Sequence, residues 1–92
     1  MVVLVNKIIC LNARNTCIRL CDKEWEAFDE ICLNEKIKRK KLVEKIKAGK
    51  SPDMGLTPAI RLFTTLYYRN LCEAFLHNIS KLSTDELIEQ LL

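Results

Sequence analysis

The sequence is poor in glycine, proline and histidine. Its 92 residues include two glycines, two prolines and one histidine. It has no glycine-rich loop for a nucleotide phosphate, and His77 has no evident nucleophile partner, so we expect that the chain is not an enzyme. It also lacks an apolar run long enough to span a membrane and an N-terminal secretory signal, which predicts a cytoplasmic protein.

The cysteines lack a pattern that would pair them. There are five, none of them in a C-x-x-C pair: Cys10, Cys17, Cys21, Cys32 and Cys72. An odd number of thiols without a secretory signal is typical of reduced cysteines that act mostly as small hydrophobic residues. We therefore expect neither a metal site nor a cofactor.

Charge is unevenly distributed along the chain. The formal net charge is +3, but residues 22–35 carry −5 and residues 36–50 carry +7. This separation of charge indicates a strongly negatively charged partner, which the small net charge alone would not indicate. A second, smaller basic zone lies within residues 1–21.

A short strand is predicted between Ala13 and Leu20, where side chains alternate along an extended chain. One face holds Thr16, Ile18 and Leu20. The other face holds Asn15, Cys17 and Arg19. No second strand with a hairpin turn follows, so we expect the strand to pair with the same strand of another copy. Residues 1–12 are an apolar lead-in that fits a strand, a helix or a mobile segment.

Helical spacing predicts that the rest of the chain is α-helical. A first helix covers residues 23–33, and a shorter one contains Leu42, Val43 and Ile46. A long helix follows over residues 58–79. A capping box at Ser83 then opens a short last helix within residues 81–92, whose Leu87, Leu91 and Leu92 would be exposed without a partner. The fold class is therefore mostly α with one short N-terminal strand.

Several sequence blocks resemble the ribbon–helix–helix DNA-binding family, in particular a bacterial variant of it. The blocks are Asn15-Thr16-Cys17-Ile18-Arg19-Leu20 with Trp25, Leu42-Val43-Glu44-Lys45-Ile46, Leu56-Thr57-Pro58-Ala59-Ile60-Arg61-Leu62-Phe63, and Tyr67-Tyr68-Arg69. The resemblance implies a ribbon–helix–helix domain over residues 13–80 and an intertwined homodimer. In that dimer the strands pair antiparallel and enter the major groove of double-stranded DNA.

This resemblance assigns the polar face of the strand to the bases. Arg19 can pair with guanine O6 and N7, and Asn15 with adenine N6 and N7. Cys17, on the same face, could contact a thymine methyl group, but we expect it to be a small neutral spacer. Without the family pattern, these side chains would simply solvate the open face of a strand.

The basic run at residues 36–41 is the predicted phosphate site. Its charges lie at the start of the second helix, where backbone N–H groups and cations favour an anion. We expect Lys38, Arg39 and Lys40 to contact DNA phosphates. A solvated charge run is the alternative, and a membrane surface is not expected because no adjacent anchor accompanies the run.

The sequence thus favours a transcriptional regulator. The alternative is an antitoxin-like or adaptor module that binds a protein partner through its C-terminal helices.

Overall fold

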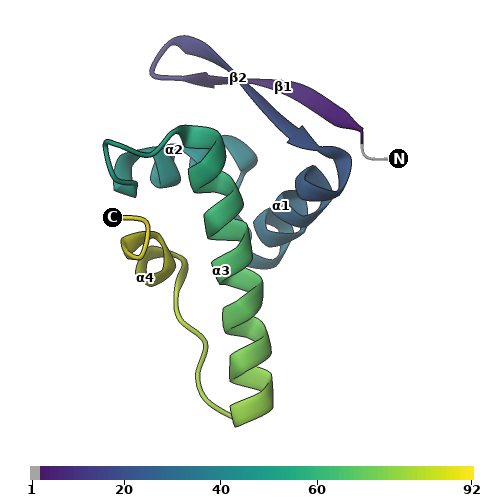
Figure 1. Ribbon diagram of the computed structural model, residues 1–92, viewed down its shortest axis with the longest axis vertical. Helices are drawn as coiled ribbons and strands as arrows, with labels where there is room; N and C mark the ends of the chain where they lie inside the picture. The colour runs from purple at the N-terminus through teal and green to yellow at the C-terminus, as the bar shows by residue number, and fades with distance from the viewer. Residues whose placement is uncertain (1–2) are drawn as a thin grey trace.

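A two-stranded antiparallel sheet precedes four helices in the computed structural model, which describes residues 3–92. The elements are β1 (Leu4–Leu11), β2 (Arg14–Cys21), α1 (Asp22–Glu35), α2 (Arg39–Gly49), α3 (Leu56–His77) and α4 (Thr84–Glu89). The hairpin lies across one end of the helical body, and α3 runs away from it (Figure 1). Among residues 3–92, no helix is long and apolar enough to cross a membrane.

The strand predicted from Ala13 to Leu20 has its partner in the same chain, which corrects the sequence-based expectation. β1 pairs with β2 in a register that runs from Leu4 opposite Cys21 to Leu11 opposite Arg14. The lead-in is therefore largely a strand. Only Asn12 and Ala13 connect the two strands, with φ angles of 50° and 63°. Positive φ at both central residues is the requirement of a type I′ hairpin turn.

The inner face of the hairpin closes the hydrophobic core. Ile18 and Leu20 are buried against α1 and α3, as the alternation along the strand predicted. The large, fully buried side chains come from both strands, from α1, α2 and α3, and from the segment after α4: Leu11, Ile18, Leu20, Phe28, Ile31, Leu42, Val43, Ile46, Ile60, Phe63 and Leu91. The single chain thus buries a continuous core without a second copy.

The last helix packs back onto this core. Leu87 and Leu91 are buried, so they are not the exposed leucines that the sequence suggested for an unpartnered helix, whereas Leu92 is exposed. A side chain at Gly49 would collide with Ile88, so the glycine allows α4 to approach α2 closely. The N–H of Ser51 also donates to the Leu91 carbonyl at 2.9 Å.

Candidate nucleic-acid interface

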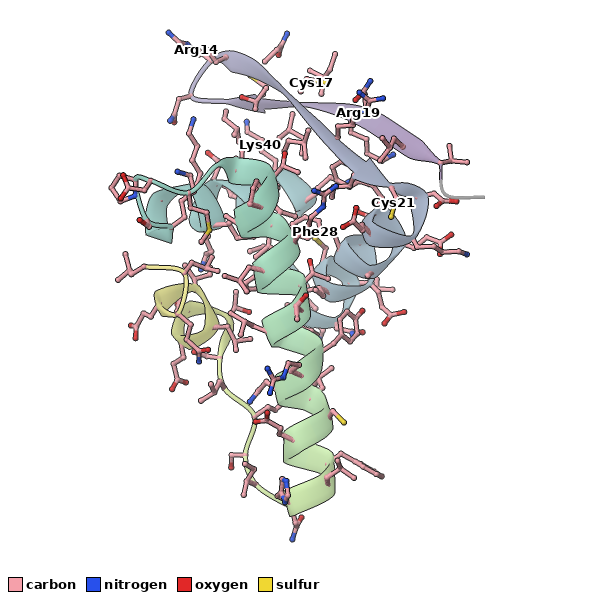
Figure 2. The ribbon with its side chains drawn as sticks, viewed as in Figure 1. Arg14, Cys17, Arg19, Cys21, Phe28 and Lys40 are labelled. Atoms are coloured by element: carbon pink, nitrogen blue, oxygen red, sulfur yellow. The ribbon has the colours of Figure 1, made fainter. Side chains whose placement is uncertain are left out.

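The outer face of β2 points away from the helices. Asn15, Cys17 and Arg19 are exposed, in alternation with the buried Ile18 and Leu20. Figure 2 shows Cys17 and Arg19 on the side of the hairpin opposite the helical body. The structure therefore brings the three predicted base-contacting residues to one open surface.

β1 contributes three further side chains to the same surface, which sequence reasoning missed. Asn6, Ile8 and Cys10 are all exposed. Residues directly opposite in an antiparallel pair point to the same face. The outer face, as we call this surface below, is made of three cross-strand pairs: Asn6 with Arg19, Ile8 with Cys17, and Cys10 with Asn15. Its middle pair is apolar, and Ile8 is 70% exposed.

Trp25 on α1 fixes the hairpin to the helices. Its indole N–H donates to the Val5 carbonyl of β1 at 2.9 Å. Two cations lie over its ring, with Lys7 Nζ 5.5 Å and Arg39 Cζ 5.2 Å from the ring centroid. Because Lys7 belongs to β1 and Arg39 to α2, this arrangement places the basic start of α2 beside the hairpin.

Arg39, a predicted phosphate contact, is engaged within the chain. Its Nε and Nη2 atoms donate to the two carboxylate oxygens of Asp29 at 2.9 and 2.7 Å. These hydrogen bonds raise the pKa of Arg39, against an opposing effect of burial. The guanidinium is therefore held in one orientation, and Asp29 offsets part of the positive charge at this site.

Lys38 and Lys40, the other two predicted phosphate contacts, are exposed at the first turn of α2. Within residues 3–92 neither of them forms a salt bridge. Lys38 is the N-cap, its ammonium group has no acceptor atom with which to cap the helix, and the first turn contains no acidic residue. Apart from Arg39, which pairs with Asp29, this end of the helix therefore concentrates positive charge that no salt bridge within residues 3–92 balances.

Glu24 stabilises the junction between β2 and α1. Its carboxylate accepts hydrogen bonds from the Cys21 N–H at 2.9 Å and from Arg61 Nε at 2.7 Å. Burial is the largest single influence and raises the pKa of Glu24, but the bonds from Cys21 and Arg61 together outweigh it and lower the pKa. The last strand residue is thereby tied to the first turn of α1 and to α3.

The described part of the chain holds no group of three residues suited to bind a metal ion. Cys10, Cys17 and Cys72 are exposed free thiols, whereas Cys32 is buried. Burial raises the pKa of the Cys32 thiol to about 11, so this cysteine stays protonated and acts as a hydrophobic core residue.

A family model, described as a ribbon-helix-helix domain, matches residues 4–68 of the chain. The match includes both strands and extends into α3. Members of this family are typically DNA-binding transcription regulators or antitoxins. Neither the search of curated proteins nor that of solved structures gave a match. Because the family model covers well over half of the sequence, the chain belongs to the ribbon–helix–helix domain family.

Proposed function

We propose that this protein is a transcription regulator that inserts its β1–β2 hairpin into the major groove of DNA. The observation that carries the proposal is the outer face, which is exposed while the inner face is buried on the helices. The major groove admits a two-stranded ribbon, and its base edges present donors, acceptors and thymine methyl groups. The outer face offers a guanidinium, two amides and an apolar pair.

Each of these side chains has a matching base edge. Arg19 would pair with guanine O6 and N7, and Asn15 and Asn6 are suited to adenine N6 and N7. Ile8 and Cys17, which lie opposite each other, would contact thymine methyl groups. Because Ile8 gives Cys17 an apolar neighbour, we favour a thymine methyl contact for Cys17 over the role of a neutral spacer.

The phosphates are assigned to the start of α2. Lys38 and Lys40 are exposed, and neither forms a salt bridge within residues 3–92. Their helix, α2, lies against β1. Arg39 is expected to contribute less to phosphate binding, because Asp29 already occupies two of its donors. Its main contribution would be to hold the first turn of α2 beside Trp25.

We also propose that the protein acts as a homodimer. The intrachain hairpin gives each copy a complete two-stranded ribbon, so dimerisation is not needed to build one. A dimer would instead present two ribbons to two half-sites, as twofold-symmetric DNA-binding proteins do.

A mobility-shift series with pooled genomic fragments at several salt concentrations tests the proposed function. We expect binding at low salt that weakens steeply as salt rises, because phosphate contacts release counterions. Lys38→Ala and Lys40→Ala should weaken binding to all sequences and flatten the salt dependence. Lys81→Ala, an equal charge change in the linker after α3, is the matched control and should leave binding unchanged. No shift even at low salt would refute DNA binding.

An antitoxin-like or adaptor module remains a second candidate. The observation that favours it is the C-terminal end of α3, where Phe75 is 87% exposed and Leu76 is also exposed. The leucines of the last helix do not favour a protein-binding module, because Leu87 and Leu91 are buried within the chain. The exposed apolar side chains at the end of α3 would then be the contact site for such a partner.

A further inference from the structure

Asp29 of α1 is the one acidic residue that forms a salt bridge with the basic run at residues 36–41, in the part of the chain that the structure describes. Its two carboxylate oxygens accept hydrogen bonds from Nε and Nη2 of Arg39. An arginine grips a phosphate with the same two-pronged geometry. Asp29 therefore takes the place of a phosphate at one edge of the guanidinium, and it offsets the charge of that group.

The pair of Asp29 and Arg39 is open enough to exchange partners. The two side chains are 43% and 36% exposed. An ion pair between partly exposed side chains is weak because water screens it, so a DNA phosphate can displace the carboxylate. The other four cations of the run are exposed and form no salt bridge within residues 3–92: Lys36, Lys38, Lys40 and Lys41. Arg39 is thus the one charge of the run that an internal acid holds back.

Trp25 connects Arg39 to the hairpin. The guanidinium lies over the indole ring, with Cζ 5.2 Å from the ring centroid, and the indole N–H is bonded to the Val5 carbonyl of β1. The attraction between a cation and a ring depends on the positive charge and not on which anion the cation binds. The ring can therefore keep Arg39 beside the hairpin while one anion replaces the other.

From this arrangement we infer that Asp29 is a specificity-determining residue, which competes with DNA phosphates for Arg39. The affinity for unrelated DNA comes almost entirely from phosphate contacts, so a carboxylate among the cations lowers it. At a recognised site the base contacts fix the hairpin in the groove, which raises the effective concentration of a phosphate at Arg39. That phosphate replaces Asp29 more readily than a phosphate of unrelated DNA does. Asp29 therefore weakens non-specific binding more than specific binding.

A purely structural role for Asp29 predicts a different result. Lys7 and Arg39 both lie near the Trp25 ring, with Lys7 Nζ 5.5 Å from its centroid, and a carboxylate beside them offsets their mutual repulsion. If this were its only role, removal of the carboxylate would lower stability without tightening DNA binding. The DNA affinity of an Asp29 variant therefore separates the two roles.

This inference rests on the proposed DNA binding. The test measures the dissociation constants of the wild type and of Asp29→Asn for a selected fragment and for unrelated DNA at several salt concentrations. Asparagine keeps the shape of the side chain and removes its charge. We expect the variant to bind unrelated DNA about 2- to 5-fold more tightly. The slope of log K against log salt should become steeper by about 0.9, as for one further phosphate contact. Affinity for the selected fragment should rise less, so the specificity ratio should fall.

A double-mutant cycle with Arg39→Gln shows whether Asp29 acts through Arg39. If it does, Asp29→Asn should change the affinity for DNA little when residue 39 is already glutamine. Glu73→Gln is the matched control, because it removes the same charge from another carboxylate that pairs with an arginine, Arg69 of α3, and it should leave the affinities unchanged. All three positions are at least partly exposed, so circular dichroism should show that the variants fold.

Several results would overturn the inference and leave the proposed function intact, because the wild type still shifts DNA in each of them. These are an unchanged affinity of Asp29→Asn for unrelated DNA, an equal gain for both DNAs, and an equal gain in the Arg39→Gln background. Weaker binding by Asp29→Asn would also overturn it, and would mean that Asp29 orients Arg39 toward DNA. A wild type that shifts no DNA would refute the proposed function itself, and this inference with it.

Discussion

The hairpin turn allows a test of the intrachain pairing of β1 and β2. Asn12 and Ala13 both have positive φ, and the favoured sequence for such a two-residue turn is Asn-Gly. An L-residue other than glycine in this region costs about 1–2 kcal/mol. Glycine also loses more conformational entropy on folding than alanine does, and this difference favours the unfolded state by about 0.4–1 kcal/mol. Ala13→Gly should therefore stabilise the protein by about 0.5–1 kcal/mol.

Urea unfolding followed by the fluorescence of Trp25 measures this effect. At an m-value of about 1 kcal/mol/M, the midpoint should rise by roughly 0.5–1 M at unchanged slope and fixed protein concentration. Ala48→Gly is the matched control, because Ala48 is an exposed helical residue of α2. There the same substitution should destabilise by about 0.5–1 kcal/mol.

The sign of the change decides between two structures of residues 4–11. If these residues were a lead-in and β2 paired only with another copy, Ala13 would have no need of a left-handed conformation. Ala13→Gly would then lower stability, as Ala48→Gly does. That result would refute the hairpin and with it the three cross-strand pairs of the outer face.

Three further predictions concern the junctions and the outer face. In the folded protein the pKa of Glu24 lies below its ordinary value of 4.5, because the fold favours the ionised carboxylate. The ionised group therefore stabilises the fold above pH 4.5, and this stabilisation should be lost as the pH falls through the lowered pKa. Unfolding at pH 3–7 should show that Glu24→Gln lacks this step. Trp25→Phe should cost at least about 0.5–1.5 kcal/mol in urea unfolding followed by circular dichroism, since it removes the bond to Val5 as well as part of a buried ring. Replacing single thymines of a selected site by uracil should weaken binding of the wild type at one or more positions, and Ile8→Ser should abolish that difference. Equal affinities for both proteins and both DNAs would refute the methyl contact.

Several elements could be predicted from the sequence because local chemistry determines them. The alternation from Asn15 to Leu20 places three side chains outward, and it appears unchanged in the structure. The capping box predicted at Ser83 is present, with its hydroxyl accepting from the Glu86 N–H. The basic turn also lies at the start of a helix, as predicted.

The sequence left the strand β1 open against a helix or a mobile lead-in for two physical reasons. Its turn contains Ala13 in place of glycine, so the usual hairpin signal is missing. Its inward face also includes Lys7, which breaks the alternation and lies over the Trp25 ring. That contact joins residues 18 positions apart, so only the folded chain reveals it.

The role of Arg39 also depended on tertiary structure. In the sequence it belongs to a uniform basic run, but in the fold it pairs with Asp29 of the preceding helix. Likewise, α4 packs onto α2 because Gly49 has no side chain that would collide with Ile88. This contact between distant residues cannot be read from the local sequence.

The central claim is that the outer face of the hairpin recognises DNA sequence. Its most direct test compares the affinity of the wild type and of Arg19→Ala for a selected fragment and for unrelated competitor DNA at one salt concentration. A bidentate guanine contact is worth about 1–3 kcal/mol of discrimination, so the specificity ratio of the variant should fall roughly 5- to 150-fold while its binding to competitor DNA changes little. An unchanged ratio would contradict the claim.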